Sequence, residues 1–143
     1  MDARARVPLR FRKLGKRRAP TAELRVRLET GEGSFKGNAL VDTGSALTII
    51  SRNDLRFGGF PVEHAMPLPG GIAGIGGRAE ARYFPSAIVT AADADGALHS
   101  VNLPRLFMTD SQIPPILGRE VLKLFNAVLH LDFHDELGWI DLG

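Results

Sequence analysis

The segment "ALVDTGSALTII", residues 39–50, places one ionisable side chain inside an apolar run. Asp42 follows three apolar residues, and after Thr43-Gly44-Ser45 the chain returns to apolar and β-branched residues. An ionised carboxylate is rarely placed in apolar surroundings without a partner or a chemical role. Because β-branched residues favour strands, we predict two strands joined by a loop that carries Asp42. The loop also has a purely structural interpretation, a turn in which the aspartate accepts backbone hydrogen bonds and the glycine supplies the bend.

The composition is that of one globular domain. The 143 residues, of which 44% are hydrophobic, are enough to bury a genuine core. The 16 glycines and 9 prolines predict many turns and few long helices. The absence of cysteine excludes disulfides and thiolate metal sites. No apolar run is long enough to span a membrane, and the N-terminus lacks the continuous apolar stretch of a secretory signal. We therefore expect a soluble, cytoplasmic protein.

The net charge of +2 is unevenly distributed along the chain. Residues 1–20 carry a large excess of arginine and lysine with Asp2 as their one acid, so residues 21–143 are net acidic. We interpret residues 1–20 as a basic N-terminal arm that is solvated or partly flexible, and residues 21–143 as the folded domain. A contact of the arm with nucleic acid or an anionic membrane is the alternative.

Hydrophobic periodicity predicts a mostly β domain. Residues 22–29 alternate apolar and charged side chains, which is the pattern of a half-buried strand, and residues 30–33, "TGEG", indicate a hairpin turn. Pro85 predicts an edge position or a break in its strand. One short helix is expected near the C-terminus, at residues 118–125. The further predicted strands are 34–41, 46–51, 78–90, 97–108, 127–133 and 139–142. Many short strands with one short C-terminal helix indicate an all-β, barrel-like domain.

Three motifs in order resemble those of retropepsin-like, retroviral-type aspartic proteases. In that family apolar residues precede an Asp-Thr-Gly-Ser or Asp-Thr-Gly-Ala active-site loop, as they precede Asp42 here. Residues 115–119, "PILGR", followed by the predicted helix, are similar to the second signature of the family. Residues 71–77, "GIAGIGG", are similar to the glycine- and isoleucine-rich flap that folds over the substrate. Together the motifs extend from residue 24 to about residue 142, which is nearly all of the chain beyond the basic arm.

The resemblance implies a single-lobe, closed β-barrel, a symmetric homodimer and hydrolysis of peptide bonds in an extended, largely apolar polypeptide. It implies no metal, nucleotide or other cofactor. Asp42, Thr43 and Gly44 would form the catalytic loop, and Ser45 would support it with a hydrogen bond to the outer oxygen of Asp42. The flap residues would be Ile72, Ala73, Gly74, Ile75 and Gly76, and the residues of the substrate pocket and its support would be Leu40, Ile116, Leu117 and Gly118.

The chain contains a single Asp-Thr-Gly, which determines the expected assembly. Aspartic-protease chemistry needs one ionised and one protonated carboxyl group, and two such groups at close range share one proton. The nearest second candidate, Asp110-Ser111-Gln112, lacks the glycine. A two-fold symmetric dimer would supply a second Asp42 from the other chain. We therefore predict a homodimer with one shared site.

Two features depart from the retroviral pattern. Ala46 and Leu47 stand where retroviral enzymes often carry acidic residues, so Arg119 is expected to lose its usual intrachain partner. The sequence also continues past the usual retroviral end by an extra hairpin, residues 134–143. Ala46 and Leu47 keep an alternative open, in which the chain is a non-catalytic dimerisation or peptide-binding module with the same fold. Such a module would have no need of a like-charged aspartate pair, so the intact Asp-Thr-Gly favours catalysis.

Overall fold

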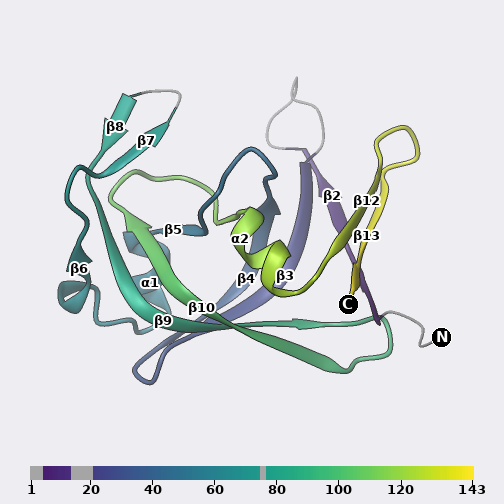
Figure 1. Ribbon diagram of the computed structural model, residues 1–143, viewed down its shortest axis with the longest axis horizontal. Helices are drawn as coiled ribbons and strands as arrows, with labels where there is room; N and C mark the ends of the chain where they lie inside the picture. The colour runs from purple at the N-terminus through teal and green to yellow at the C-terminus, as the bar shows by residue number, and fades with distance from the viewer. Residues whose placement is uncertain (1–4, 14–20, 75–76) are drawn as a thin grey trace.

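The computed structural model describes residues 5–13, 21–74 and 77–143. Within these residues a ring of six strands forms a closed barrel, in the order β3-β4-β11-β5-β10-β9, and pairing of β9 with β3 closes it (Figure 1). Strands β2 and β6 extend the sheet at its two sides. The barrel strands are β3 (Thr21–Glu29), β4 (Ser34–Val41), β11 (Ile116–Leu117), β5 (Ile49–Ser51), β10 (Leu98–Thr109) and β9 (Ala81–Ala92), and the flanking strands are β2 (Arg10–Arg12) and β6 (Met66–Pro67). The all-β prediction is confirmed.

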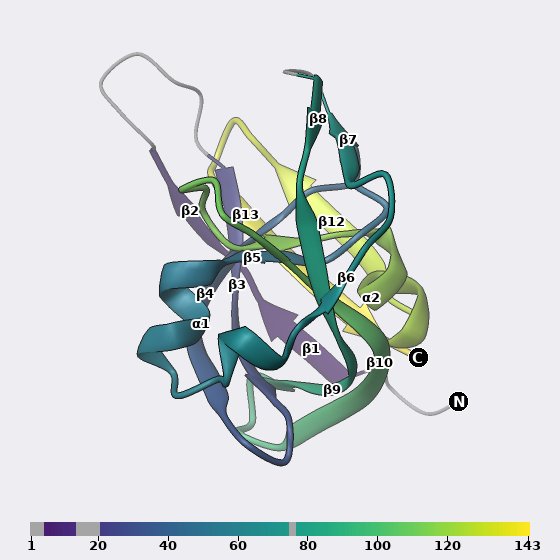
Figure 2. The ribbon, with the colours of Figure 1, turned by 90° about the vertical axis from the view of Figure 1, so that its left-hand side faces the viewer.

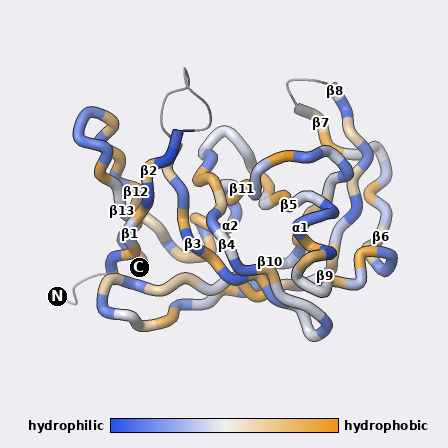
Figure 3. Tube along the Cα trace, turned by 180° about the vertical axis from the view of Figure 1, so that it is seen from behind, coloured by the Kyte–Doolittle hydropathy of each residue, from blue (hydrophilic) through white to orange (hydrophobic). Residues whose placement is uncertain are grey.

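Strand β3 shows how the sequence pattern becomes a barrel wall. Leu24, Val26 and Leu28 are buried, while Arg25 and Arg27 between them are exposed. The predicted turn after β3 is present, with the amide of Thr30 donating to the carbonyl of Gly33 at 3.0 Å. Apolar and polar residues interleave along the strands when the chain is seen from behind (Figure 3). Over residues 24–28 one face of β3 therefore packs in the core and the other meets solvent.

Pro85 lies at a locally open edge, as its sequence context predicts. Strand β9 pairs with β10 along most of its length, but its other side meets β6 at residues 82–83 and β3 at residues 88–90. Pro85 sits between those two contacts, where no amide hydrogen is needed for a ladder bond. The next residue, Ser86, has a φ of 74°, so the strand is locally distorted there.

The described residues contain two short α-helices, where the sequence predicts one. The C-terminal helix is α2 (Arg119–Leu124), as expected. Residues 51–54 have the composition of a short helical turn, and the structure extends it to a helix, α1 (Arg52–Phe57). Ser51 caps α1 by accepting the amide of Asp54 at 3.3 Å, and Leu55 anchors it in the core. A 3-10 turn, η1 (Val62–His64), follows.

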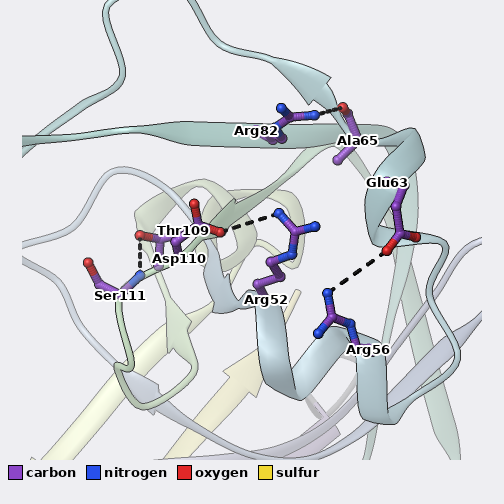
Figure 4. A network of polar contacts seen from close by, with 8 residues as sticks. All are labelled: Arg52, Arg56, Glu63, Ala65, Arg82, Thr109, Asp110 and Ser111. Carbon is purple, nitrogen blue, oxygen red and sulfur yellow. Dashed lines mark hydrogen bonds and ion pairs between the residues drawn. The ribbon is translucent and has the colours of Figure 1, made fainter.

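Polar contacts tie α1 to its neighbours (Figure 4). A guanidinium nitrogen of Arg52 lies 3.6 Å from a carboxylate oxygen of Asp110 at the end of β10. Arg56 makes a similar contact, 3.9 Å, with Glu63 of η1. Exposed ion pairs of this kind contribute little stability individually. The buried side chain of Leu55 therefore does most to hold α1 in place.

Part of the predicted basic arm belongs to the folded domain. Strand β1 (Ala5–Pro8) pairs with β13 (Leu137–Leu142), which pairs in turn with β12 (Val128–Asp132) to form a three-stranded sheet (Figure 2). Val7 is 2% exposed, and Phe11 of β2 makes an edge-to-face contact with Phe133. These apolar side chains explain why the segment folds despite its arginines. Residues 1–4 and 14–20 of the arm lie outside the described residues.

The helices of the described residues are all short. None of them has both the length and the apolar composition needed to cross a membrane.

Candidate active site

The loop that carries Asp42 leaves the barrel between β4 and β5. Strand β11, which belongs to the second predicted motif, lies parallel to β4 with Ile116 beside Leu40. The amide of Asp42 donates to the carbonyl of Leu117 at 3.0 Å. The fold thus brings the Asp42 loop into direct backbone contact with residues 115–119, the second signature. In Figure 1 the loop lies at the upper edge of the barrel.

Hydrogen bonds within the loop fix the orientation of the Asp42 carboxylate. The amide of Gly44 donates to Oδ1 of Asp42 at 2.9 Å, and the amide of Ser45 donates to its backbone carbonyl at 3.1 Å. Asp42 is half-buried, while Thr43 and Gly44 are exposed. Among the described residues, no hydrogen-bond donor contacts the second carboxylate oxygen, Oδ2. The arrangement leaves that oxygen available to water or to a second carboxyl group.

Ser45 supports the loop differently from the prediction. Its hydroxyl donates to the carbonyl of Leu47 at 2.8 Å and accepts the amide of Leu47 at 3.3 Å. The predicted bond to Asp42 is therefore absent from this chain, because the hydroxyl hydrogen is already used within the loop. Ser45 instead stabilises the backbone that follows Gly44, through its two hydrogen bonds to Leu47.

The start of α2 satisfies the carbonyl groups of the same loop. The amide of Arg119 donates to the carbonyl of Ser45 at 2.8 Å, and the amide of Glu120 donates to that of Ala46 at 3.2 Å. Amides in the first turn of a helix have no partner within the helix, so they are free to bond here. A Cβ at Gly118 would collide with the carbonyl oxygen of Leu47 and would lie 2.7 Å from that of Ser45. The loop can approach α2 this closely because residue 118 is glycine.

Arg119 binds the Asp42 loop directly. The acidic residues that it would pair with in retroviral enzymes are absent, as the sequence indicates, but the side chain is not unpartnered. Its Nη1 donates to the carbonyl of Thr43 at 2.7 Å. The sequence does not predict this contact, because every residue carries a backbone carbonyl and residue types therefore do not reveal which one accepts the bond.

The predicted pocket residues differ in their exposure. Leu40 and Ile116 are half-buried beside the loop. Leu117 is fully buried and packs in the core, and Gly118 is buried under the loop. Leu40 and Ile116 can thus meet a bound peptide, whereas Leu117 and Gly118 support the loop from below.

The glycine-rich segment forms a hairpin on the same side of the molecule as the Asp42 loop (Figures 1 and 2). Its strands are β7 (Ile72–Gly74) and β8 (Gly77–Ala79), with Gly74 opposite Gly77. The predicted flap residues Ile75 and Gly76 lie outside the described residues. Gly71 has a φ of +65° and packs against the carbonyl of Ala79, so a larger residue would be strained there. A cavity of about 460 Å³ lies between the base of this hairpin and the end of β10.

No group of three histidine, aspartate or glutamate side chains with the spacing of a metal site occurs in residues 5–13, 21–74 and 77–143.

An Asp-Thr-Gly loop between two barrel strands, supported by a parallel strand and a short helix, defines the single-lobe architecture of aspartic proteases. The model of the retroviral aspartyl protease family matches residues 16–130. The chain belongs to this family. Its fold is retropepsin-like.

Two solved structures give the extent of the likeness. A retropepsin-like aspartic protease from Rickettsia conorii is 12% identical with a TM-score of 0.56, and the match covers 96% of this chain and 90% of that one. EIAV protease in complex with an inhibitor is 22% identical with a TM-score of 0.49, and the match covers 82% of this chain and 100% of that one. No curated protein sequence matches the chain.

Proposed function

We propose that the protein is an aspartic endopeptidase, in which Asp42 from each of two identical chains forms one catalytic site. The observation that carries the proposal is the Asp42 carboxylate, which the Gly44 amide holds by one oxygen on an exposed loop and whose other oxygen has no donor among the described residues. Membership of the retroviral aspartyl protease family supports the same chemistry.

The reaction needs two carboxyl groups that share one proton. The ionised group takes a proton from water, whose oxygen attacks the carbonyl carbon of the scissile peptide bond. The protonated group donates a hydrogen bond to the carbonyl oxygen, which becomes a hydroxyl in the tetrahedral intermediate. The carboxyl group that took the proton from water then passes it to the peptide nitrogen, while the other carboxylate takes back a proton from a hydroxyl of the intermediate. The carbon–nitrogen bond breaks to give an amine and a carboxylic acid, and the pair again holds one proton. One chain supplies a single Asp-Thr-Gly, so the second group comes from a two-fold related copy.

Residues around Asp42 would have supporting roles in the dimer. Thr43 and Gly44 are exposed on the loop, so Thr43 can bond the opposite loop and the Gly44 carbonyl can bind the substrate backbone. Ile72, Ala73 and Gly74 of the hairpin would fold over an extended peptide and bind its main chain. Closing the hairpin would also exclude bulk water from the site.

The proposal is tested by comparing Asp42→Asn with Asp110→Asn. Both substitutions remove one carboxylate, but Asp110 is exposed and its partner is the side chain of Arg52. We expect Asp42→Asn to lower cleavage of a peptide library by about a thousandfold or more, because an amide cannot accept the proton of water. Asp110→Asn should cleave at the wild-type rate. Mass spectrometry of the products measures both, and circular dichroism verifies folding.

The same measurements separate catalysis from the alternative of a peptide-binding module. Undiminished cleavage by purified Asp42→Asn, or its loss in Asp110→Asn, would contradict an Asp42 pair. If wild-type protein binds peptides but never cleaves them, the binding module is the correct interpretation. A transition-state mimic of the statine type gives a further distinction, since its tight binding requires the pair that shares a proton.

A further inference from the structure

A surface groove begins at the two residues that follow the Asp42 loop. It lies between α2 and β10, has a volume of about 700 Å³, and is called the α2–β10 groove below. Its apolar lining consists of Ala46, Leu47, Pro104 and Phe107. Nothing in the chemistry described above uses this groove, although Ala46 and Leu47 are covalently continuous with the catalytic loop.

Three cationic side chains surround the α2–β10 groove: Arg105 from β10, and Arg119 and Lys123 from α2. Within the described residues, none of the three has a carboxylate oxygen within 4 Å, whereas nine other pairs do. Arg105 lies over the ring of Tyr83 at 4.8 Å, which fixes its position without neutralising it. The groove therefore presents positive charge beside apolar surface.

Glu120 is the one acidic residue that lines the groove. Its Oε2 atom is enclosed and has no hydrogen-bond partner among the described residues. Burial raises the pKa of the Glu120 carboxyl group, and the positive charge of Arg105 opposes that rise. One carboxyl group against three cationic side chains leaves the groove with an excess of positive charge, which can attract a second, external carboxylate.

We propose that the α2–β10 groove binds the stretch of substrate next to the cleavage site, and that it selects peptides with an acidic residue beside an apolar one. The apolar side chain would cover Leu47 and Phe107, and the carboxylate would lie between Arg105 and Lys123. The inference rests on the proposed function only in identifying the bound peptide as a substrate. Arg119 connects the two regions, because it lines the groove and also bonds to Thr43.

The positive charges of Arg105 and Lys123 determine how strongly the groove should prefer an acidic peptide. An exposed ion pair contributes modestly, so each of Arg105 and Lys123 should strengthen binding of an acidic peptide by about two- to fivefold. Together they predict a preference of about tenfold for glutamate over glutamine at the position concerned. A lysine there should bind more weakly than glutamine, because like charges repel across the groove. The preference should shrink in high salt.

The test measures binding separately from turnover. Folded Asp42→Asn protein, which has the whole groove, is immobilised and exposed to a synthetic library of randomised octapeptides. Bound peptides are sequenced, and a selected peptide is then made with glutamate, glutamine or lysine at the enriched position for fluorescence anisotropy. We expect enrichment of an acidic residue adjacent to leucine, isoleucine or phenylalanine, and the order glutamate, glutamine, lysine in affinity.

Substitutions of Arg105 and Lys123 test whether these two side chains cause the preference for glutamate. Arg105→Gln and Lys123→Gln are introduced together into the Asp42→Asn protein. They should abolish the preference for glutamate and leave the affinity for the glutamine peptide unchanged. Arg25→Gln and Lys36→Gln, introduced together, are the matched control, because both side chains are exposed, on β3 and β4, and their loss removes the same two positive charges. A preference that survives the Arg105/Lys123 substitution, or that the Arg25/Lys36 substitution reduces equally, overturns the inference.

The inference and the proposed function can fail independently. If wild-type protein cleaves glutamate, glutamine and lysine peptides with equal kcat/KM, the inference is wrong and the proposed function stands. If Asp42→Asn protein binds acidic peptides preferentially but wild-type protein cleaves none of them, the inference stands and the proposed function is wrong.

Discussion

Gly118 is the residue on which the shape of the Asp42 loop depends most directly. It lies where the loop meets α2, and a methyl group there would collide with the carbonyl of Leu47. We expect Gly118→Ala to lower the free energy of unfolding by about 1–3 kcal/mol, because backbone on both sides would have to move. Urea denaturation monitored by circular dichroism measures the change.

Gly31→Ala is the control for this prediction. An added Cβ at Gly31 would meet no atom within 4 Å, so its effect should stay within about 0.5 kcal/mol. The displaced loop should also lose proteolytic activity in Gly118→Ala but not in Gly31→Ala. Equal unfolding free energies for the two variants would show that the loop moves away from α2 without cost.

The candidate site is predictable from sequence where a residue type is unusual for its surroundings. Asp42 stands out because a carboxylate interrupts apolar strands, and Gly118 because glycine precedes a helix in a recognisable motif. The partners of Ser45 and Arg119 are not predictable in this way. Both side chains bond to backbone carbonyls, which every residue carries, so their choice depends on the folded path of the chain. The α2–β10 groove is equally invisible, since β10 and α2 meet only in the fold.

The three-stranded sheet of β1, β13 and β12 depends on a charged cluster at Asp141. The Nε of Arg6 donates to one oxygen of Asp141 at 3.1 Å, and Nε2 of His130 lies 3.1 Å from the other. The guanidinium of Arg6 also lies over the ring of Trp139 at 4.4 Å. The Arg6 hydrogen bond holds the pKa of Asp141 below its usual value of 3.8. The cluster joins the N-terminal strand to the C-terminal one.

This pKa shift predicts how stability varies with acid. Because the folded pKa of Asp141 is depressed, its contribution is fully present above pH 3.8 and is lost as pH falls through the folded value. Asp141→Asn should therefore unfold at lower urea concentration than wild type at neutral pH. The difference should narrow below pH 3.8 and vanish once Asp141 is protonated in the folded protein.

The matched control for this comparison is Asp135→Asn, an exposed position in the turn between β12 and β13. Its urea midpoint should follow that of wild type at every pH. A constant gap between Asp141→Asn and wild type from neutral to acid pH would mean that Asp141 acts through packing alone.

The strands differ in how far sequence determines them. Strand β3 is predictable because alternation is a local property of residues 22–29. Strands β1 and β2 are obscured by arginines at positions 6, 10 and 12, which suggest a solvated arm. They form because Val7 and Phe11, on the alternate positions, find apolar partners in elements distant in sequence. Such tertiary contacts override local composition.

Two loops and one hairpin lie on the same side of the molecule. The Asp42 loop, the β7–β8 hairpin and the turn between β12 and β13 all point toward the top of Figure 1. Large apolar side chains remain exposed on and near that turn, with Phe133 at 56% and Leu137 at 57%. Exposed apolar groups on the side that carries the Asp42 loop support the proposal that this side contacts another copy of the chain.

A shared site makes a quantitative prediction about mixed assemblies. When equal amounts of wild-type and Asp42→Asn chains are unfolded and refolded together, pairs form at random. If both Asp42 carboxylates are needed, activity per total protein should fall to about a quarter of wild type, since mixed pairs are inactive. Chains that work alone would give about half. Refolding wild type with Lys36→Gln, whose substitution is distant from the loop, should give full activity. An activity near half of wild type in the Asp42→Asn mixture would exclude the symmetric site. The second carboxylate would then lie in the same chain, and the Asp110→Asn variant tests the candidate.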